Sequence, residues 1–275
     1  MLKLALLGSN VTHSLSPLVY ESFFTRCNER YQYNIFNLSE NELYEQVSSL
    51  ITLGYDGFNI TNPHKFSICK LVSDRAAKVT KVGCANVVKI DMHGNTFAAN
   101  TDGIGFIRHL KSLELPLINN VLILGSGGVV PAILSELLAA DIKVDITVRN
   151  MQRAAAVLSS FSGIGLLSLR KDYNLNMTYD LIINASGVCL KDFIPFIPNG
   201  VLKKANTYYD LAYSKAATYS VDFALKSGCK YALNGVGMLV YQAAYAIEVW
   251  TGNLPSSFDI ASTLLGLEDF YVCNL

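Results

Sequence analysis

The first eighty residues alternate between two periods of apolar and polar positions. Short apolar or alternating runs, typical of strands, are each followed by a segment with helical spacing. The strands are expected over 2–7, 31–36 and 57–60, and the helices over 17–27, 41–52 and 66–72. Ser16 directly precedes Pro17 and is the expected N-cap of the first helix. This alternation predicts a three-layer α/β unit with a largely parallel sheet.

Residues 82–100 have a different pattern. Two short strands, 86–90 and 96–99, flank the polar run 91–95, which predicts a β-hairpin. A helix over 103–113 and a polar, proline-marked connection over 116–120 follow. We expect this helix to bridge two domains.

The second half again alternates strands with helices. Strands are expected over 121–124, 143–148, 164–168, 180–184 and 207–210, and helices over 131–140, 151–159, 218–227 and 238–250. Pro195 and Pro198 mark the loop before the last of these strands. The fold class is therefore α/β, and 275 residues suffice for two domains, with one large domain as the alternative.

A glycine turn joins the strand at 121–124 to the next helix. Gly125, Gly127 and Gly128 lie between an uncharged apolar run and a helix start, where backbone N–H groups and the helix dipole suit a pyrophosphate. The dinucleotide fingerprint G-x-G-x-x-G calls for a small residue at position 130, where this chain has Val130. The glycines alone fit a coenzyme turn and an ordinary strand–helix turn equally well.

The end of the following strand favours a coenzyme site. Arg149, Asn150 and Arg153 lie where an NAD site has an acidic residue, and an arginine there suits the 2′-phosphate of NADP. Asp145 precedes the end of the strand and should lie to one side. The alternative is a solvated surface arginine.

Composition limits the classes of function. Of the 275 residues, 51% are hydrophobic and 16% charged, which is typical of a packed globular protein. Lys+Arg and Asp+Glu both number 22, so no basic field is available for nucleic acid or for a membrane surface. The opening run 2–7 is too short for a signal peptide, and no apolar run approaches the roughly 18 residues of a membrane helix. We expect a cytoplasmic protein whose six cysteines are buried and reduced, namely Cys27, Cys69, Cys84, Cys189, Cys229 and Cys273.

Lys65 and Asp102 are the candidates for acid–base chemistry. Lys65 follows a short strand, where parallel sheets place ligands, and a carboxylate such as Asp102 could orient it. Each also has a simpler explanation, Lys65 as a surface charge and Asp102 as a helix N-cap. The loop 13–16 offers two hydroxyls that could hold a small carboxylate, or that could simply cap the helix. The four histidines lack metal-ligand spacing and no G-x-S-x-G motif is present, so we expect no metal and no serine nucleophile.

Motifs in chain order resemble those of the shikimate dehydrogenase family. The family's G-x-x-x-x-H-S-x-S-P, N-[VI]-T-x-P-x-K, G-A-x-N-T and N-T-D-x-x-G correspond to residues 8–17, 59–65, 83–87 and 100–105. Its G-x-G-G loop, the arginine after the second strand, and its closing motifs correspond to 125–128, 149, 209–213 and 234–242. The resemblance covers nearly the whole chain.

The resemblance implies a fold, a reaction and a set of site residues. It implies a substrate domain of residues 1–102 and 237–275, a Rossmann-like NADP domain of residues 103–236, and a cleft between them. The reaction would be the reversible NADPH-dependent reduction of 3-dehydroshikimate to shikimate, in aromatic amino acid biosynthesis. Lys65 and Asp102 would be catalytic. The substrate contacts would come from Ser14, Ser16, Asn59, Thr61, Lys65, Asn86, Asp102, Tyr213 and Gln242. The coenzyme contacts would come from Gly125, Ser126, Gly127, Gly128, Val129, Arg149, Asn150, Arg153, Ala185, Ser186, Leu211, Gly235 and Met238.

The chain departs from the family pattern at four places. Asn10 replaces a frequent Pro, Ser214-Lys215 replaces Asn-Pro, and residues 184–188 replace N-A-T-S-x-G. Val148 replaces the Asn before the coenzyme arginine, which weakens the expected preference for NADP. The rival functions are a quinate/shikimate dehydrogenase that uses NAD and a catalytically silent NADP-binding regulator. The presence of both Lys65 and Asp102 argues against the regulator. The partners expected are small molecules, with the chain a monomer or homodimer.

Overall fold

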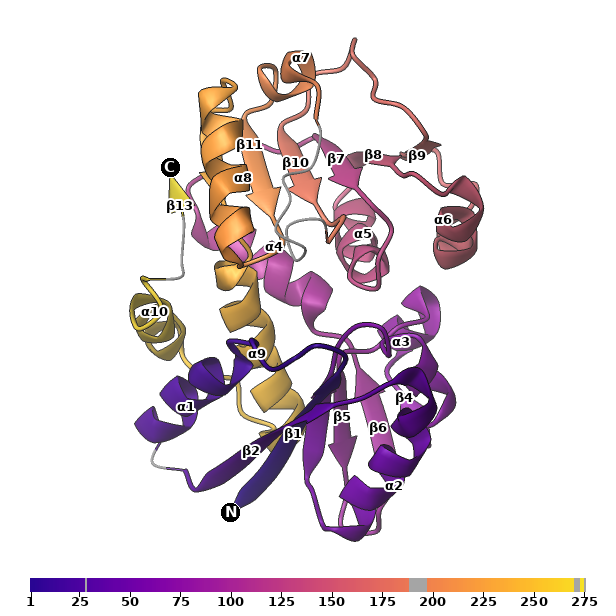
Figure 1. Ribbon diagram of the computed structural model, residues 1–275, viewed down its shortest axis with the longest axis vertical. Helices are drawn as coiled ribbons and strands as arrows, with labels where there is room; N and C mark the ends of the chain where they lie inside the picture. Colours follow the sequence, from indigo (N-terminus) through magenta and orange to yellow (C-terminus); the bar gives the residue numbers. More distant parts are fainter. Residues whose placement is uncertain (28, 188–196, 270–272, 275) are drawn as a thin grey trace. The chain divides into compact units, whose positions relative to one another are not determined.

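The computed structural model describes residues 1–27, 29–187, 197–269 and 273–274 (Figure 1). The chain divides into two compact units. The first unit comprises Met1–Gly105 and Leu239–Gly266, and the second comprises Phe106–Met238 and Leu267–Leu275. Two helices, α4 (Asp102–Ser112) and α9 (Val236–Thr251), run through a boundary between the units, so the helix expected over 103–113 does connect them.

The first unit contains a mixed six-stranded sheet in the order β2-β1-β3-β5-β6-β4. The strands are β1 (Leu2–Gly8), β2 (Tyr31–Asn37), β3 (Gly57–Ile60), β4 (Asp74–Arg75), β5 (Val87–Ile90) and β6 (Thr96–Ala99). β1 pairs in parallel with β2 and β3, as the strand–helix alternation predicts. β5 is antiparallel to both β3 and β6 because it belongs to the predicted hairpin.

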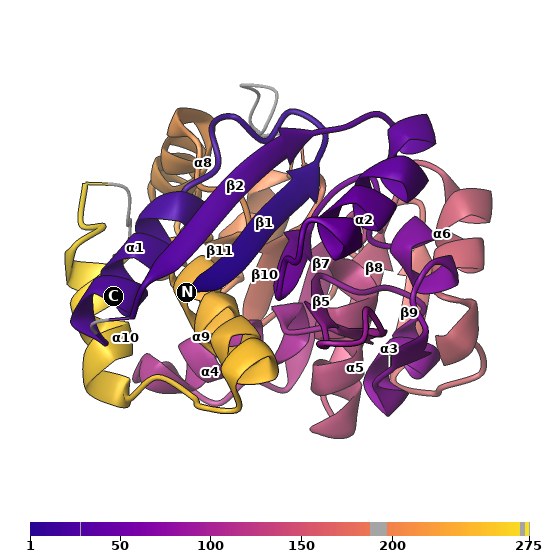
Figure 2. The same ribbon diagram turned by 90° about the horizontal axis from the view of Figure 1, so that it is seen from below.

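Helices cover both faces of this sheet (Figures 1 and 2). The helices are α1 (Ser16–Arg26), α2 (Leu43–Thr52), α3 (Ala77–Val82), α9 and α10 (Ser257–Leu265). Phe58 and Ile60 of β3 belong to one apolar cluster with Val47 and Leu50 of α2. On the opposite face, the indole of Trp250 in α9 donates a hydrogen bond to the carbonyl of Val88 (3.0 Å). The unit therefore has three layers, as expected.

Two local predictions for the first unit are wrong. The helix expected over 66–72 is reduced to a 3-10 turn at Ser67–Lys70. Ser16 is the first residue of α1, and the N-cap position belongs to Leu15, which makes no side-chain capping hydrogen bond. Ser14, two residues earlier, provides the side chain that binds the backbone N–H of Ser16 (3.2 Å).

The second unit contains a seven-stranded sheet in the order β13-β12-β11-β10-β7-β8-β9, parallel except for β13. The strands are β7 (Asn120–Leu124), β8 (Lys143–Thr147), β9 (Leu167–Arg170), β10 (Leu181–Asn184), β11 (Thr207–Asp210), β12 (Tyr231–Leu233) and β13 (Cys273–Asn274). The helices include α5 (Val130–Ala139), α6 (Met151–Val157), α7 (Asn199–Leu202) and α8 (Lys215–Lys226). The strand order reverses beside β7, and such a switch point is where doubly wound sheets bind dinucleotides.

The end of the chain differs from the expected pattern of elements. β13 pairs antiparallel with β12, so the last described residues belong to the second unit instead of following α10 in the first. The assignment of residues 1–102 and 237–275 to substrate and 103–236 to coenzyme concerns function and stays a prediction.

The cysteines whose side chains are described are free but not all buried. Cys69, Cys84 and Cys229 are buried and free, whereas Cys27 is free but exposed, contrary to expectation. No helix in the described part of the chain is long and apolar enough to cross a membrane. Three residues named in the expectations from sequence lie outside the described residues, namely Val188, Cys189 and Pro195.

Candidate active site

The first unit brings Lys65 and Asp102 together, although 37 residues separate them. Lys65 lies in the loop after β3, and Asp102 is the first residue of α4. The Nζ of Lys65 is 2.5 Å from Oδ2 of Asp102, and the two residues are only 8% and 5% exposed. Lys65 is therefore no solvated surface charge. A buried ammonium paired with a carboxylate is a group that can stabilise a negative oxygen and exchange a proton with it.

Neighbouring side chains fix the Asp102 carboxylate. Asn86, which directly precedes β5, donates from Nδ2 to Oδ1 of Asp102 (2.9 Å), so both carboxylate oxygens have partners. The backbone N–H of Asp102 donates to Oδ1 of Asn100 (3.0 Å). Burial raises the pKa of the neighbouring Cys84 thiol to about 12, so this group stays neutral beside the ion pair.

Thr101 and Gln242 extend this cluster. Nδ2 of Asn86 also lies 3.0 Å from Oγ1 of Thr101 and 3.2 Å from Oε1 of Gln242, while Oδ1 of Asn86 accepts from the N–H of Thr101 (2.7 Å). A Cβ at Gly105 would lie 2.6 Å from the backbone nitrogen of Gln242, so α4 and α9 approach closely here. Thr101 is absent from the expected site residues. Its position beside Asp102 in the N-T-D motif is the signal that could have identified it.

Ser14 and Ser16 form a pair of hydroxyls at the start of α1. Oγ of Ser14 donates to Oγ of Ser16 (3.1 Å), and Ser16 is 7% exposed. The N–H of Ser16 already binds Oγ of Ser14, and Pro17 has no N–H. The two hydroxyls, more than the N–H groups of the helix, are therefore what suits a carboxylate here.

Asn59 and Thr61 lie at the end of β3. Oδ1 of Asn59 accepts from the hydroxyl of Tyr33 (2.8 Å), and its Nδ2 donates to the carbonyl of Asn86 (3.4 Å). The side chain of Asn59 thus supports the backbone of Asn86. Thr61 is partly buried against Gly8, where a Cβ would overlap its methyl group. Tyr213 belongs to the second unit.

The glycine turn of the second unit follows the carboxyl end of β7. Gly125 has a φ of 100°, and a Cβ there would lie 2.9 Å from both the carbonyl oxygen of Ala185 and the Cα of Ser186. The turn thus packs against the segment that follows β10. Ser126, Gly127 and Gly128 complete the turn, and Val129 occupies the N-cap position of α5 without a side-chain cap. Val130 is fully buried, so its side chain faces the interior instead of the turn.

A buried Asn–Asp pair holds the loops after β10 and β11. Nδ2 of Asn184 donates to Oδ2 of Asp210 (2.9 Å), and Oδ1 of Asn184 accepts from the hydroxyl of Ser186 (2.7 Å). Oδ1 of Asp210 accepts from the N–H of Ala212 (3.0 Å). Neither Asn184 nor Asp210 was predicted. Their signal is a polar residue at the carboxyl end of each of two adjacent parallel strands.

The remaining expected coenzyme residues follow β8, β11 and β12. Arg149 and Arg153 are exposed, and Asn150 is the N-cap of α6, where its side chain accepts from the N–H of Arg153 (2.9 Å). Gly235 is buried against Leu211, because a Cβ there would overlap the carbonyl oxygen of Leu211. Met238 lies in the first turn of α9.

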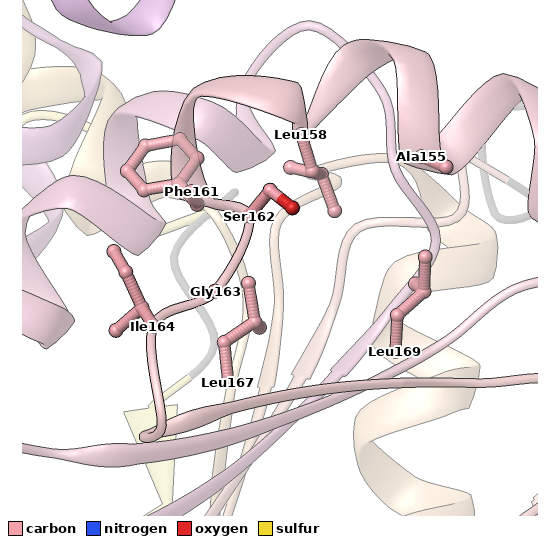
Figure 3. Close-up of a pocket in the computed structure, with 8 residues that line it drawn as sticks. All are labelled: Ala155, Leu158, Phe161, Ser162, Gly163, Ile164, Leu167 and Leu169. Atoms are coloured by element: carbon pink, nitrogen blue, oxygen red, sulfur yellow. The ribbon is translucent and has the colours of Figure 1, made fainter.

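A small cavity in the second unit lies apart from these groups. It has a volume of about 200 Å³ and is lined by residues of α6, the following 3-10 turn and β9 (Figure 3). Its lining is Ala155, Leu158, Phe161, Ser162, Gly163, Ile164, Leu167 and Leu169. No charged side chain lines it, so it does not suit a phosphate or a carboxylate. Within the described residues, no group of three His, Cys, Asp or Glu side chains could hold a metal ion.

Comparisons with known proteins identify the family. One family model, described as "Shikimate dehydrogenase substrate binding domain", matches residues 6–88, and another, described as "Shikimate 5'-dehydrogenase C-terminal domain", matches residues 235–256. A protein of Methanococcus maripaludis named shikimate dehydrogenase (NADP(+)) is 34% identical over 272 residues, covering 94% of this chain and 95% of its own. The chain belongs to the shikimate dehydrogenase family.

Solved structures agree with membership of the shikimate dehydrogenase family. A shikimate 5-dehydrogenase from Thermus thermophilus, in complex with NADP(H) and shikimate, is 27% identical, covers 97% of this chain and 99% of its own, and has a TM-score of 0.83. An Ael1 enzyme from Pseudomonas putida is 30% identical, covers 99% of both chains and has a TM-score of 0.85. Both sheets described above therefore belong to the shikimate dehydrogenase fold.

Proposed function

We propose that this protein is an NADP-dependent shikimate dehydrogenase, which reversibly reduces 3-dehydroshikimate to shikimate in aromatic amino acid biosynthesis. The observation that carries the proposal is the buried Lys65–Asp102 pair in a chain of this family. The names of the relatives support both the reaction and the coenzyme. A silent regulator has no need for a buried ammonium–carboxylate pair.

The second unit has the groups that NADP requires. The glycine turn at the strand-order switch point and the uncapped start of α5 suit the pyrophosphate, and Arg149 suits the 2′-phosphate. NADPH supplies the hydride for reduction and NADP⁺ accepts it in the reverse direction. The protein must bind the substrate, orient it and handle one proton.

Lys65 handles that proton. When hydride reaches the ketone carbon, negative charge develops on the oxygen, and Nζ of Lys65 stabilises this charge and donates a proton to the oxygen. In the oxidation of shikimate, the neutral amine takes the proton from the hydroxyl. Asp102, held by Asn86 through Oδ1, keeps Nζ in position during both steps.

The other site residues would bind the rest of the substrate. Ser14 and Ser16 would hold the carboxylate. The ring hydroxyls would bind Thr61, Asn86 and Gln242, and Asn59 would contribute by holding the backbone of Asn86. We further propose a cytoplasmic monomer or homodimer.

The direct test mixes the purified protein with shikimate and NADP, and then with NAD, while following the absorbance of the reduced coenzyme. We expect turnover, with a higher kcat/KM for NADP than for NAD. The same assay with quinate tests the rival activity. A higher kcat/KM with NAD, or with quinate, would assign the chain to the rival quinate/shikimate dehydrogenase.

Replacing Arg149 with alanine should raise the KM for NADP by about tenfold or more, because a phosphate–guanidinium contact contributes roughly 1.5–3 kcal/mol. The KM for NAD should stay within about twofold, since NAD has no 2′-phosphate. The matched control is Lys171→Ala, which removes an exposed cation just after β9. Equal losses with both coenzymes would show that Arg149 does not read the 2′-phosphate.

A further inference from the structure

His109 and Tyr209 form a buried pair in the second unit that the proposed mechanism does not use. His109 lies on α4 and Tyr209 on β11, and both are fully buried. Nδ1 of His109 is 2.7 Å from the hydroxyl of Tyr209, and the two rings meet edge to face. Burial lowers the pKa of His109 to about 3, so the imidazole is neutral at the pH at which enzymes of this kind work.

The hydroxyl of Tyr209 also binds the first turn of α9. The backbone N–H of Met238 donates to this oxygen (3.2 Å). Because a backbone N–H can only donate, the phenol accepts from Met238, and its own proton can then be donated to Nδ1 of His109. The hydroxyl thus links a helix N–H group to a buried imidazole.

His109 also contacts the same turn directly. A Cβ at Gly237 would overlap the imidazole ring, so glycine is what lets the helix approach the histidine this closely. One residue before α9, Gly235 packs against Leu211 and its N–H donates to the carbonyl of Ala212 (2.9 Å). The start of α9 is therefore held by His109, Tyr209 and the end of β11.

The strand order places this turn near the nicotinamide end of the coenzyme. The strands lie in the order β8-β7-β10-β11-β12. Arg149 follows β8, at one end of this series, and the glycine turn follows the next strand, β7. With the 2′-phosphate beside β8 and the pyrophosphate at β7, the rest of a dinucleotide extends across the carboxyl ends of β10, β11 and β12. Leu211 and Gly235 follow β11 and β12.

We propose that His109 and Tyr209 are positioning residues for hydride transfer. Together they hold Gly237 and Met238, the first turn of α9, in the position where the nicotinamide ring packs against Met238 and the adjoining Gly235. The inference rests on the proposed function. Reacting atoms misplaced by about 1 Å can lower a rate by about 10². The expected effect is therefore on kcat, since the phosphate contacts that dominate NADP binding remain.

The test is Tyr209→Phe, which removes one oxygen and keeps the ring packed against Phe106. We expect kcat for shikimate oxidation to fall at least fivefold at saturating substrates, with the Kd of NADP within about twofold of wild type. The isotope effect on kcat, measured with shikimate deuterated at the oxidised carbon, should rise. A merely structural role would lower Tm without changing this isotope effect.

Tyr208→Phe is the matched control. Tyr208 is the preceding residue on β11, and its buried hydroxyl is 2.5 Å from Oγ of Ser220 on α8. This variant should lose stability but keep kcat within twofold. A second variant, His109→Leu, should lower kcat in the same direction, and combining it with Tyr209→Phe should add little.

The inference fails if Tyr209→Phe keeps kcat within twofold of wild type, if Tyr208→Phe loses as much, or if the loss lies in NADP affinity alone. The wild-type rate with shikimate and NADP tests the proposed function itself. The ratio of variant to wild type tests the positioning role, so the two failures have separate readouts.

Discussion

Replacing Lys65 with methionine should lower kcat for shikimate oxidation by about 10³, within the 10²–10⁴ that a positioned acid–base group contributes. The methionine keeps most of the buried stem of the lysine but has no group that can exchange a proton. The affinity for NADP, measured by quenching of protein fluorescence, should stay within about twofold, because the expected coenzyme groups belong to the other unit. Steady-state kinetics with both substrates varied separates the two effects.

The controls distinguish lost chemistry from lost structure. Lys70→Met removes an exposed lysine five residues further along and should leave kcat unchanged. Lys65→Met leaves the buried Asp102 carboxylate without its cation, which should cost about 3–5 kcal/mol of unfolding free energy. Adding Asp102→Asn should recover most of this stability but no activity. Near-normal turnover of Lys65→Met would remove Lys65 from the mechanism.

Replacing Gly127 with alanine should raise the Kd of NADP at least tenfold, or about 1.4 kcal/mol, while changing the unfolding free energy by less than about 0.5 kcal/mol. The nearest atom to a Cβ at this position is 3.9 Å away, so alanine fits the folded chain. The new methyl group would, however, occupy space that the phosphates need at the main chain. Coenzyme titration and denaturant unfolding measure the two quantities.

Gly125→Ala is the matched comparison in the same turn. Gly125 has a φ of 100°, and a Cβ there would lie 2.9 Å from the carbonyl oxygen of Ala185. Alanine should therefore lower the unfolding free energy by about 2–3 kcal/mol. If Gly127→Ala bound NADP normally, the pyrophosphate would have to lie elsewhere.

The chain's periodic segments and motifs predicted much of this structure. The first three strands, the hairpin and strands β7, β8, β10 and β11 follow from apolar periodicity. β9 begins three residues later than the strand expected over 164–168. Lys65 and Asp102 were predicted as catalytic residues from their motifs, and the structure shows that their side chains form an ion pair. By contrast, β12 and α10 were not predicted. β12 has only three residues, which carry little periodic signal, and in α10 the apolar side chain of Phe258 is exposed, so the apolar positions of that helix do not mark its buried face.

The errors and omissions concern contacts that depend on three-dimensional position. The helix expected over 66–72 became a 3-10 turn, and Ser16 is inside its helix instead of capping it. Asn184 pairs with Asp210 only because the register of β10 and β11 places them side by side. His109 was considered only as a metal ligand, since nothing local indicates that Tyr209, one hundred residues away, would lie beside it.

The hydrogen bonds of Asn86 determine how firmly the cluster around Asp102 is held before any ligand binds. Its side-chain amide carries two hydrogens, yet oxygens of Thr101, Asp102 and Gln242 all lie within 2.9–3.2 Å of the nitrogen. Two hydrogens cannot serve three acceptors at full strength, so one of these contacts is always weak. The hydroxyl of Thr101 lies 3.4 Å from Oε1 of Gln242 and can donate to it, so the amide of Asn86 can serve Asp102 and Thr101. Every oxygen in the cluster then has a donor, so the hydrogen bonds that orient Asp102 do not wait for a ligand to complete them.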